Sequence, residues 1–183
     1  MNHVKIRIAK LLASYNYGSR REIENLISNK KIKNYFSYIF DILYQQSIKA
    51  QKKKEVPISA LIFDPKSNRI ISKSHNQNIQ DNNPCSHAEI ISIIKACKKL
   101  KKNRLDGMDL YCSSEPCLMC SSVIFQSKIR RVYFATDDKK NGALINNYKL
   151  GLKKNLNHRI DIYCGFQEEK FSKLLKNFFK KRR

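Results

Sequence analysis

Apolar and polar residues are patterned along most of the chain in ways that predict helices and strands from about residue 35 onward. Helices are predicted over residues 35–53, 87–102, 116–127 and 168–181, and short apolar runs predict five strands at 58–63, 69–73, 108–112, 131–135 and 159–164. Turn residues at 64–68 join the first two strands in a hairpin. Strands that alternate with helices indicate an α/β fold, whose sheet contains parallel strands and carries helices on both faces.

The first 34 residues form a predicted extension to this body, which spans residues 35–183. Ile6, Ile8, Leu11 and Leu12 predict one short helix, and a second helix follows the break at Gly18. The pattern R-I-A-K-L-L-A, then G-S-R-R-E-I-E-N-L-I, then K-K-I-K resembles the two-helix opening of the small RNA-binding fold that precedes some pseudouridine synthases, although the strand hairpin of that fold is missing. The alternative is an inert basic extension.

Charge favours a polyanionic partner. Lys and Arg total 37 against 15 Asp and Glu, a net charge of +22, which attracts nucleic acid through its phosphates. A solvated surface of biased composition is the alternative. No apolar run approaches the ~18 residues that cross a bilayer, and no signal peptide is visible, so we expect a cytoplasmic protein without membrane contact.

Two of the six cysteines have the spacing of metal ligands. Cys117 and Cys120 stand three apart where a helix is predicted to begin, so both sulfurs can reach one ion, and Pro116 suits the first helical position. His87 is a candidate third ligand. Three protein ligands leave tetrahedral zinc one open position for water, whose pKa then falls to about 7. Cys85 could instead complete a closed structural site, and the scattered remaining cysteines imply no disulfide framework.

Glu89 is the candidate catalytic residue. Hydrolytic removal of an amino group from a base needs a carboxyl group that takes a proton from water and returns it to the ring and to the departing ammonia. A carboxylate beside the metal, but not bound to it, can do this. Since residues two apart on a helix point to different sides, Glu89 must lie on an end turn to approach the metal with His87.

These motifs, H-A-E at 87–89 and P-C-L-M-C at 116–120, match the signature of zinc deaminases. With E-V-P-I at 55–58, D-K-K-N-G at 138–142, N-H-R at 157–159 and F-F-K-K-R-R at the end, residues 35–183 resemble the bacterial tRNA adenosine deaminases of the cytidine deaminase superfamily. The resemblance implies a three-layer cytidine-deaminase-like fold with a mixed five-stranded sheet.

The resemblance also implies a reaction and a substrate. One Zn²⁺ per subunit would be held by His87, Cys117 and Cys120, and Glu89 would move protons while the wobble adenosine of a tRNA anticodon becomes inosine. The chain would act as a homodimer, on an arginine tRNA with an ACG anticodon. The implied substrate-binding residues are Asn76, Ala88, Asp138, Lys140, Asn157, His158, Phe178, Phe179 and Arg182.

Other interpretations stay open. Asn76 could cap local backbone, His158 could be an ordinary loop histidine, Phe178 and Phe179 could be core anchors, and the basic C-terminus could be a solvated tail. Two other functions are a deaminase of a free base or nucleotide, such as guanine or cytosine, and an inactive zinc-stabilised RNA-binding protein. Serines depart from the family pattern at positions we expect to line or back the base pocket, namely Ser59, Ser113, Ser114, Ser121 and Ser122.

Overall fold

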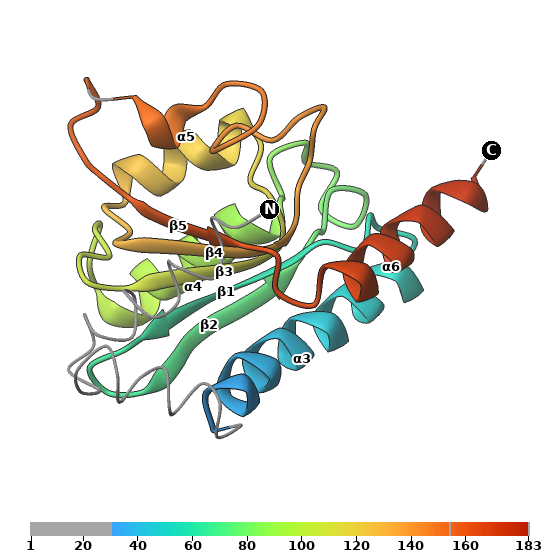
Figure 1. Cartoon of the computed structure of the whole chain (residues 1–183), viewed down its shortest axis with the longest axis horizontal. Coiled ribbons are helices and arrows are strands. Elements are labelled where there is room, and N and C mark those ends of the chain that lie inside the picture. The colour runs from blue at the N-terminus through green and yellow to red at the C-terminus, as the bar shows by residue number, and fades with distance from the viewer. Residues whose placement is uncertain (1–30, 154, 183) are drawn as a thin grey trace. The chain divides into compact units, whose positions relative to one another are not determined.

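The structure is a computed structural model that describes residues 31–153 and 155–182 (Figure 1). The chain divides into two compact units, one ending at Ile39 and one running from Phe40. Of the first unit, the structure describes the start of helix α3 (Lys31–Lys52), which continues into the second. The predicted two-helix extension lies almost entirely outside the described residues, so its resemblance and its boundary at residue 34 stay predictions.

The second unit is built on a mixed sheet of five strands. These are β1 (Ser59–Asp64), β2 (Arg69–His75), β3 (Asp109–Ser114), β4 (Arg131–Thr136) and β5 (Asp161–Cys164). They lie in the order β2-β1-β3-β4-β5, with β1 antiparallel to β2 and β3 while β3, β4 and β5 run parallel. The prediction of a mixed five-stranded sheet is confirmed.

Helices cover both faces of this sheet (Figure 1). Helices α4 (Ala88–Leu100) and α5 (Leu118–Gln126) pack on one face, and α6 (Glu168–Lys180) packs on the other together with α3 from Phe40 onward. The three layers agree with the predicted architecture. No described helix has the length and apolar character that a bilayer span requires.

The two faces of the sheet have different cores, because successive side chains along each strand point to opposite faces. Ile62, Cys112 and Phe134 point toward α4 and α5 and join an aliphatic core there. On the opposite face, Tyr111, Tyr133 and Tyr163 occupy paired positions of β3, β4 and β5, and their rings stack in series with centroids 4.4 and 5.1 Å apart. The layer of α3 and α6 therefore packs against a row of stacked tyrosine rings on the sheet.

Helix α5 starts later than predicted. Cys117 is its N-cap, with extended backbone at φ −70 and ψ 175, so Pro116 precedes the cap and the prediction that it takes the first helical position is wrong. The reason is a contact distant in sequence, because Cys117 forms an isolated β-bridge with Gly142 that keeps the chain extended at that point. Helix α4 similarly ends at Leu100, where Lys101 turns into the left-handed region at φ 52.

Candidate active site

Three predicted metal ligands converge at the N-terminal ends of α4 and α5. His87 is the N-cap of α4, Cys117 is the N-cap of α5, and Cys120 lies in the first turn of α5. The His87 Nδ1 atom is 3.7 Å from the sulfur of Cys117 and 3.5 Å from that of Cys120. The ligand atoms of all three residues lie within 4.8 Å of one another, so one ion can reach them together.

The chemistry of this donor set fits zinc. One imidazole and two thiols are donors that Zn²⁺ prefers, and three protein ligands leave one position open. Cys85 is exposed and lies outside the group, which does not support the closed site of four ligands. None of the six cysteines, all of which lie in the described ranges, forms a disulfide.

Hydrogen bonds within the group shift its proton affinities in the ion-free protein. A hydrogen bond from Cys120 lowers the pKa of the Cys117 thiol to about 4, and the same bond, together with burial, raises the pKa of Cys120. The hydrogen bond with Cys117 raises the pKa of His87. Since zinc binds thiolates and neutral imidazole, loading the site displaces protons.

Glu89 lies in the first turn of α4, as its predicted role requires. Its side chain is only 3% exposed, and its Oε2 atom has no hydrogen-bond partner among the described residues. Burial raises the pKa of this carboxyl to about 7 in the absence of an ion. A buried carboxyl oxygen without a partner, beside three metal donors, is the expected signature of a group that meets water or substrate.

The start of α4 is held by the chain that precedes it. Asn76 is buried, and its Oδ1 accepts the N–H of Ala88, the first residue of α4, at 2.9 Å. This is the backbone-capping role left open for Asn76, and its contact with a nucleotide stays a prediction, as does that of Ala88. Glu55, also buried, accepts the N–H groups of Ile79 and Gln80 at 2.8 and 2.9 Å. The loop that leads to His87 is thereby fixed.

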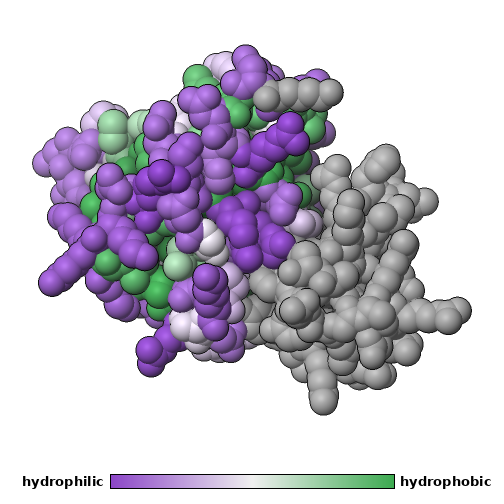
Figure 2. Space-filling model, turned by 90° about the vertical axis from the view of Figure 1, so that its left-hand side faces the viewer, coloured by the Kyte–Doolittle hydropathy of each residue, from purple (hydrophilic) through white to green (hydrophobic). Residues whose placement is uncertain are grey.

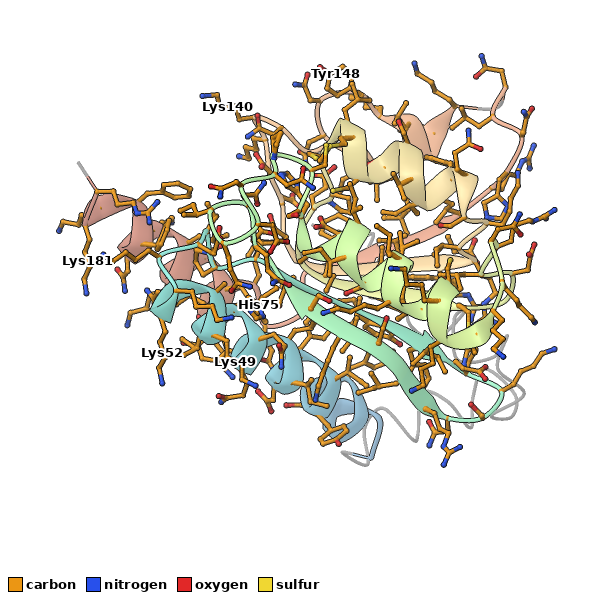
Figure 3. The ribbon with its side chains drawn as sticks, turned by 180° about the vertical axis from the view of Figure 1, so that it is seen from behind. Lys49, Lys52, His75, Lys140, Tyr148 and Lys181 are labelled. Atoms are coloured by element: carbon orange, nitrogen blue, oxygen red, sulfur yellow. The ribbon has the colours of Figure 1, made fainter. Side chains whose placement is uncertain are left out.

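The loop between β4 and the 3₁₀ helix η1 (Leu150–Leu152) brings Asp138 and Lys140 close to Cys117. The β-bridge between Cys117 and Gly142 holds the loop there. Asp138 Oδ1 accepts the N–H groups of Lys140 and Asn141 at 3.0 and 2.9 Å, so this carboxylate caps a tight turn. The Lys140 side chain is exposed and projects from the loop (Figure 3), where it is available to a bound anion.

Asn157 and His158 are not brought to the metal donors of the same chain. His158 donates from Nε2 to the carbonyl oxygen of Ile129 at 2.6 Å, and Lys128 donates to the carbonyl oxygen of Asn157. Both contacts lie between the end of α5 and the start of β4, whereas Cys117 precedes the start of α5. The length of α5 separates the two places, and the RNA contacts implied for Asn157 and His158 stay predictions.

The C-terminal aromatic pair divides between core and surface. Phe178 is buried at 5% exposure, while Phe179 is 50% exposed. Arg182 lies over the Phe178 ring, 4.3 Å from its centroid, and donates to the carbonyl oxygen of Lys54 just beyond α3. The core interpretation holds for Phe178, and the exposed ring of Phe179 lies edge-on to it, with the centroids 5.4 Å apart. The RNA contacts implied for both rings stay predictions.

Ser59 and Ser113, two of the serines that depart from the family pattern, form hydrogen bonds on the face of the sheet that α3 covers. The Ser59 hydroxyl accepts from Ser47 at 2.9 Å and donates to the carbonyl oxygen of Leu43 at 2.8 Å, both on α3. The Ser113 hydroxyl accepts the N–H of Ser59. Both hydroxyls are buried and satisfied beneath α3, on the face of the sheet opposite to α4 and α5. The expectation that these positions line or back the base pocket stays a prediction. Ser121 and Ser122 bond within α5 or just before it.

Two of the buried acidic residues that had no predicted role hold loops near the metal donors. Glu55 and Glu115 are 2% and 4% exposed, and each binds backbone of a loop beside the metal donors. The available signal was an acidic residue directly before Pro116 at the end of a buried strand, a position where a charge needs partners.

Comparison with known proteins decides the family. A model of the MafB19-like deaminases matches residues 35–183. The tRNA-specific adenosine deaminase of Rickettsia bellii is 40% identical over 132 residues, which are 72% of this chain and 91% of that protein. The chain belongs to the tRNA-specific adenosine deaminase family. The protein of that name from Aquifex aeolicus is 37% identical to this deaminase over 146 residues, 80% of this chain and 95% of the relative.

Solved structures agree with the deaminase fold. One from a study of A-to-I editing by tRNA:A34 deaminases at the wobble position of transfer RNA matches with a TM-score of 0.72 and 33% identity, over 76% of this chain and 99% of the other. A guanine deaminase from Nitrosomonas europaea matches with a TM-score of 0.60 over 78% and 81% of the two chains, and at 21% identity it shows the shared fold alone.

Proposed function

We propose that this deaminase hydrolyses the wobble adenosine of a tRNA anticodon to inosine and releases ammonia. The observation that carries the proposal is the buried Glu89 carboxyl, with one unpartnered oxygen, beside the converging His87, Cys117 and Cys120 donors. Relatives named tRNA-specific adenosine deaminases support the substrate.

His87, Cys117 and Cys120 would hold one Zn²⁺. When bound, the ion supplies a Lewis acid that lowers the pKa of a water molecule to about 7. Glu89 takes the two protons of the attacking water in turn, and it passes one to N1 of the purine and the other to the departing amino group. Oxygen adds at C6, the bond from C6 to the amino nitrogen breaks, and adenosine plus water become inosine plus ammonia. The burial of Glu89 keeps bulk water from these transfers.

A basic surface at the ends of α3 and α6 would meet the tRNA backbone. Arg182 joins the two helix ends through the Lys54 carbonyl, and Lys49, Lys52 and Lys181 project outward there (Figure 3). Lys53 donates to Gln80 at 2.7 Å, which links this surface to the loop that leads to His87. Phosphates of an anticodon stem-loop are the expected ligands, and an arginine tRNA with an ACG anticodon is the proposed substrate.

A homodimer is part of the proposal. Ile94 of α4 and Leu118 of α5 are large apolar residues, exposed at 46% and 40%, on the two neighbouring helices that bear the metal donors. Covering them would remove apolar surface from water. Light scattering of the full chain would report its mass in solution.

The substrate is tested with an in vitro transcript of the arginine tRNA, beside free adenosine, guanine and cytosine, with inosine read by reverse transcription and sequencing. We expect conversion of the wobble adenosine alone. Turnover of a free base with untouched tRNA would make the chain a free-base deaminase instead.

Glu89→Gln tests the assigned proton transfer. We expect the rate of tRNA conversion to fall by about 10²–10⁴-fold, because the amide cannot carry a proton between water and the base. Zinc content, measured by mass spectrometry, and tRNA affinity should stay at wild-type values. Unchanged turnover would remove Glu89 from the mechanism, and tRNA binding without turnover by the wild-type protein would favour the inactive RNA-binding alternative.

A further inference from the structure

Glu115 is a buried charged residue that the mechanism above does not use. It follows β3, precedes Pro116, and stands two residues before the metal donor Cys117, with 4% of its side chain exposed. Acidic side chains are almost never buried unless their oxygens are occupied. The partners of this carboxylate therefore show what it does.

All of the hydrogen bonds that Glu115 accepts from the described residues come from one loop, residues 137–147. Oε1 accepts the N–H groups of Ile145 and Asn146 at 2.8 and 3.1 Å. Oε2 accepts the N–H of Asp138 at 3.3 Å and a further bond from the Asn146 side chain. Glu115 thus binds the loop both near its start, at Asp138, and near its end, at Ile145 and Asn146.

Backbone contacts hold the middle of the same loop against the segment that carries Cys117. Ala143 donates its N–H to the Pro116 carbonyl oxygen at 3.0 Å, and Gly142 pairs with Cys117 in a β-bridge. A Cβ added at Gly142 would overlap Oε2 of Glu115 and the carbonyl oxygen of Asp138. Gly142 is needed here for space, since its φ lies outside the left-handed region.

We propose that Glu115 is a positioning residue, a buried clamp that fixes the 137–147 loop to the metal-donor segment and thereby sets affinity for the tRNA. The inference rests on the proposed function, in which Asp138 and Lys140 of this loop contact the nucleotide. A loop already held in place loses less conformational freedom when RNA binds. The clamp touches neither the reacting atoms nor the metal donors' own ligand atoms, so it acts on binding more than on chemistry.

The central test is Glu115→Gln in the full zinc-loaded chain. Glutamine keeps the size of the side chain but turns an N–H group toward donors of the loop. We expect KM for tRNA to rise by about 10-fold or more while kcat changes by less than about 3-fold. Amide hydrogen exchange at Asp138, Ile145 and Asn146 should accelerate by about 10-fold or more, with α4 amides and zinc content unchanged.

Glu55→Gln is the matched control, because Glu55 is an equally buried glutamate that binds the amides of a different loop. It should accelerate exchange at Ile79 and Gln80 and leave the 137–147 amides protected. Gly142→Ala places a methyl group against the Glu115 carboxylate from the loop side, so it should displace the loop and reproduce the rise in KM. Combined with Glu115→Ala, it should add less than it does alone, since the Glu115 atoms it would overlap are then absent and only the overlap with the Asp138 carbonyl oxygen remains.

Several results would overturn the clamp. Unchanged exchange in the 137–147 loop of Glu115→Gln would do so, as would lost zinc and lost kcat at wild-type KM. If Glu115→Gln does not fold, Gly142→Ala decides, with wild-type KM and exchange counting against the proposal. Amide exchange is measured without substrate, so it does not depend on the proposed function. If the wild-type protein fails to deaminate tRNA but Glu115→Gln still accelerates exchange in the 137–147 loop, the clamp is upheld and the proposed function is rejected.

Discussion

Glu89 and Glu115 lie in the same buried region, and their oxygens have opposite surroundings. Glu115 accepts hydrogen bonds at both oxygens, whereas Oε2 of Glu89 has none from the described residues. A satisfied buried carboxylate holds structure in place, while an unsatisfied one is costly to keep and is retained for chemistry. The number of hydrogen-bond donors around each carboxyl group distinguishes the structural role of Glu115 from the chemical role of Glu89. The positions of the two residues in the sequence do not show this difference.

His75 makes stability depend on pH at the scale of one residue. Burial lowers its pKa below the ordinary value of 6.5, and Lys53, Lys95 and Lys49 lower it further, against an opposing contribution from Glu55. The unfolded chain therefore binds the proton more readily than the folded one. Stability from this group is complete above about pH 6.5 and is lost as the pH falls toward the folded pKa.

His75→Gln should remove that dependence. Between about pH 7 and about pH 5, the free energy of unfolding of the wild-type protein should fall more steeply than that of the variant, as measured by urea titration at each pH. Parallel curves for the two proteins would show that His75 is not the group responsible.

At the scale of elements, hydrophobic spacing located every described α-helix and strand of the second unit to within a few residues, because each buries one face against a layer. It did not locate the short 3₁₀ helix η1. The ends were harder to place. Helix α5 begins after Cys117 because of a bridge to Gly142, a residue far along the chain. The two cysteine donors were predictable from local spacing and His87 from the H-A-E motif, whereas the roles of Glu55 and Glu115 depend on loops that only the folded chain brings to them.

Helix α6 allows core and RNA roles to be separated on neighbouring residues. Phe178→Ala empties a buried site and should cost about 3 kcal/mol of stability. Phe179→Ala removes an exposed ring, so stability should change by less than about 0.5 kcal/mol while tRNA binding weakens by about 1 kcal/mol or more if the ring stacks on a base. Thermal melts and filter binding measure the two quantities. Equal binding by wild type and Phe179→Ala would leave that ring without an RNA role.

At the scale of the whole molecule, the net charge of +22 dominates. The described part of the face in Figure 2 is mainly hydrophilic, with small separate hydrophobic areas. Such a field favours any polyanion, so charge alone does not choose a tRNA. Selectivity must therefore come from contacts with the bases and with the shape of the anticodon loop.

Salt dependence tests whether the basic surface at the ends of α3 and α6 contacts phosphates. The triple variant Lys49→Ala, Lys52→Ala, Lys181→Ala should reduce the slope of log affinity against log salt concentration by about 2, because each lost contact with single-stranded RNA contributes about 0.7. Lys66→Ala, Lys101→Ala, Lys102→Ala removes the same charge elsewhere and should leave the slope nearly unchanged. Equal slopes for the two triple variants would mean that the surface contributes only to the general field.

The clamp on the 137–147 loop has a consequence for how this enzyme can be altered. Glu115 holds the loop mainly by main-chain N–H groups, which every residue except proline carries. The exposed side chains of Lys139 and Lys140 take no part in that grip. Sequence can therefore drift, or be randomised in a library, at these two positions while the loop keeps its shape. A search for variants that accept a different nucleic acid would do well to begin there and to leave Glu115 and Gly142 alone.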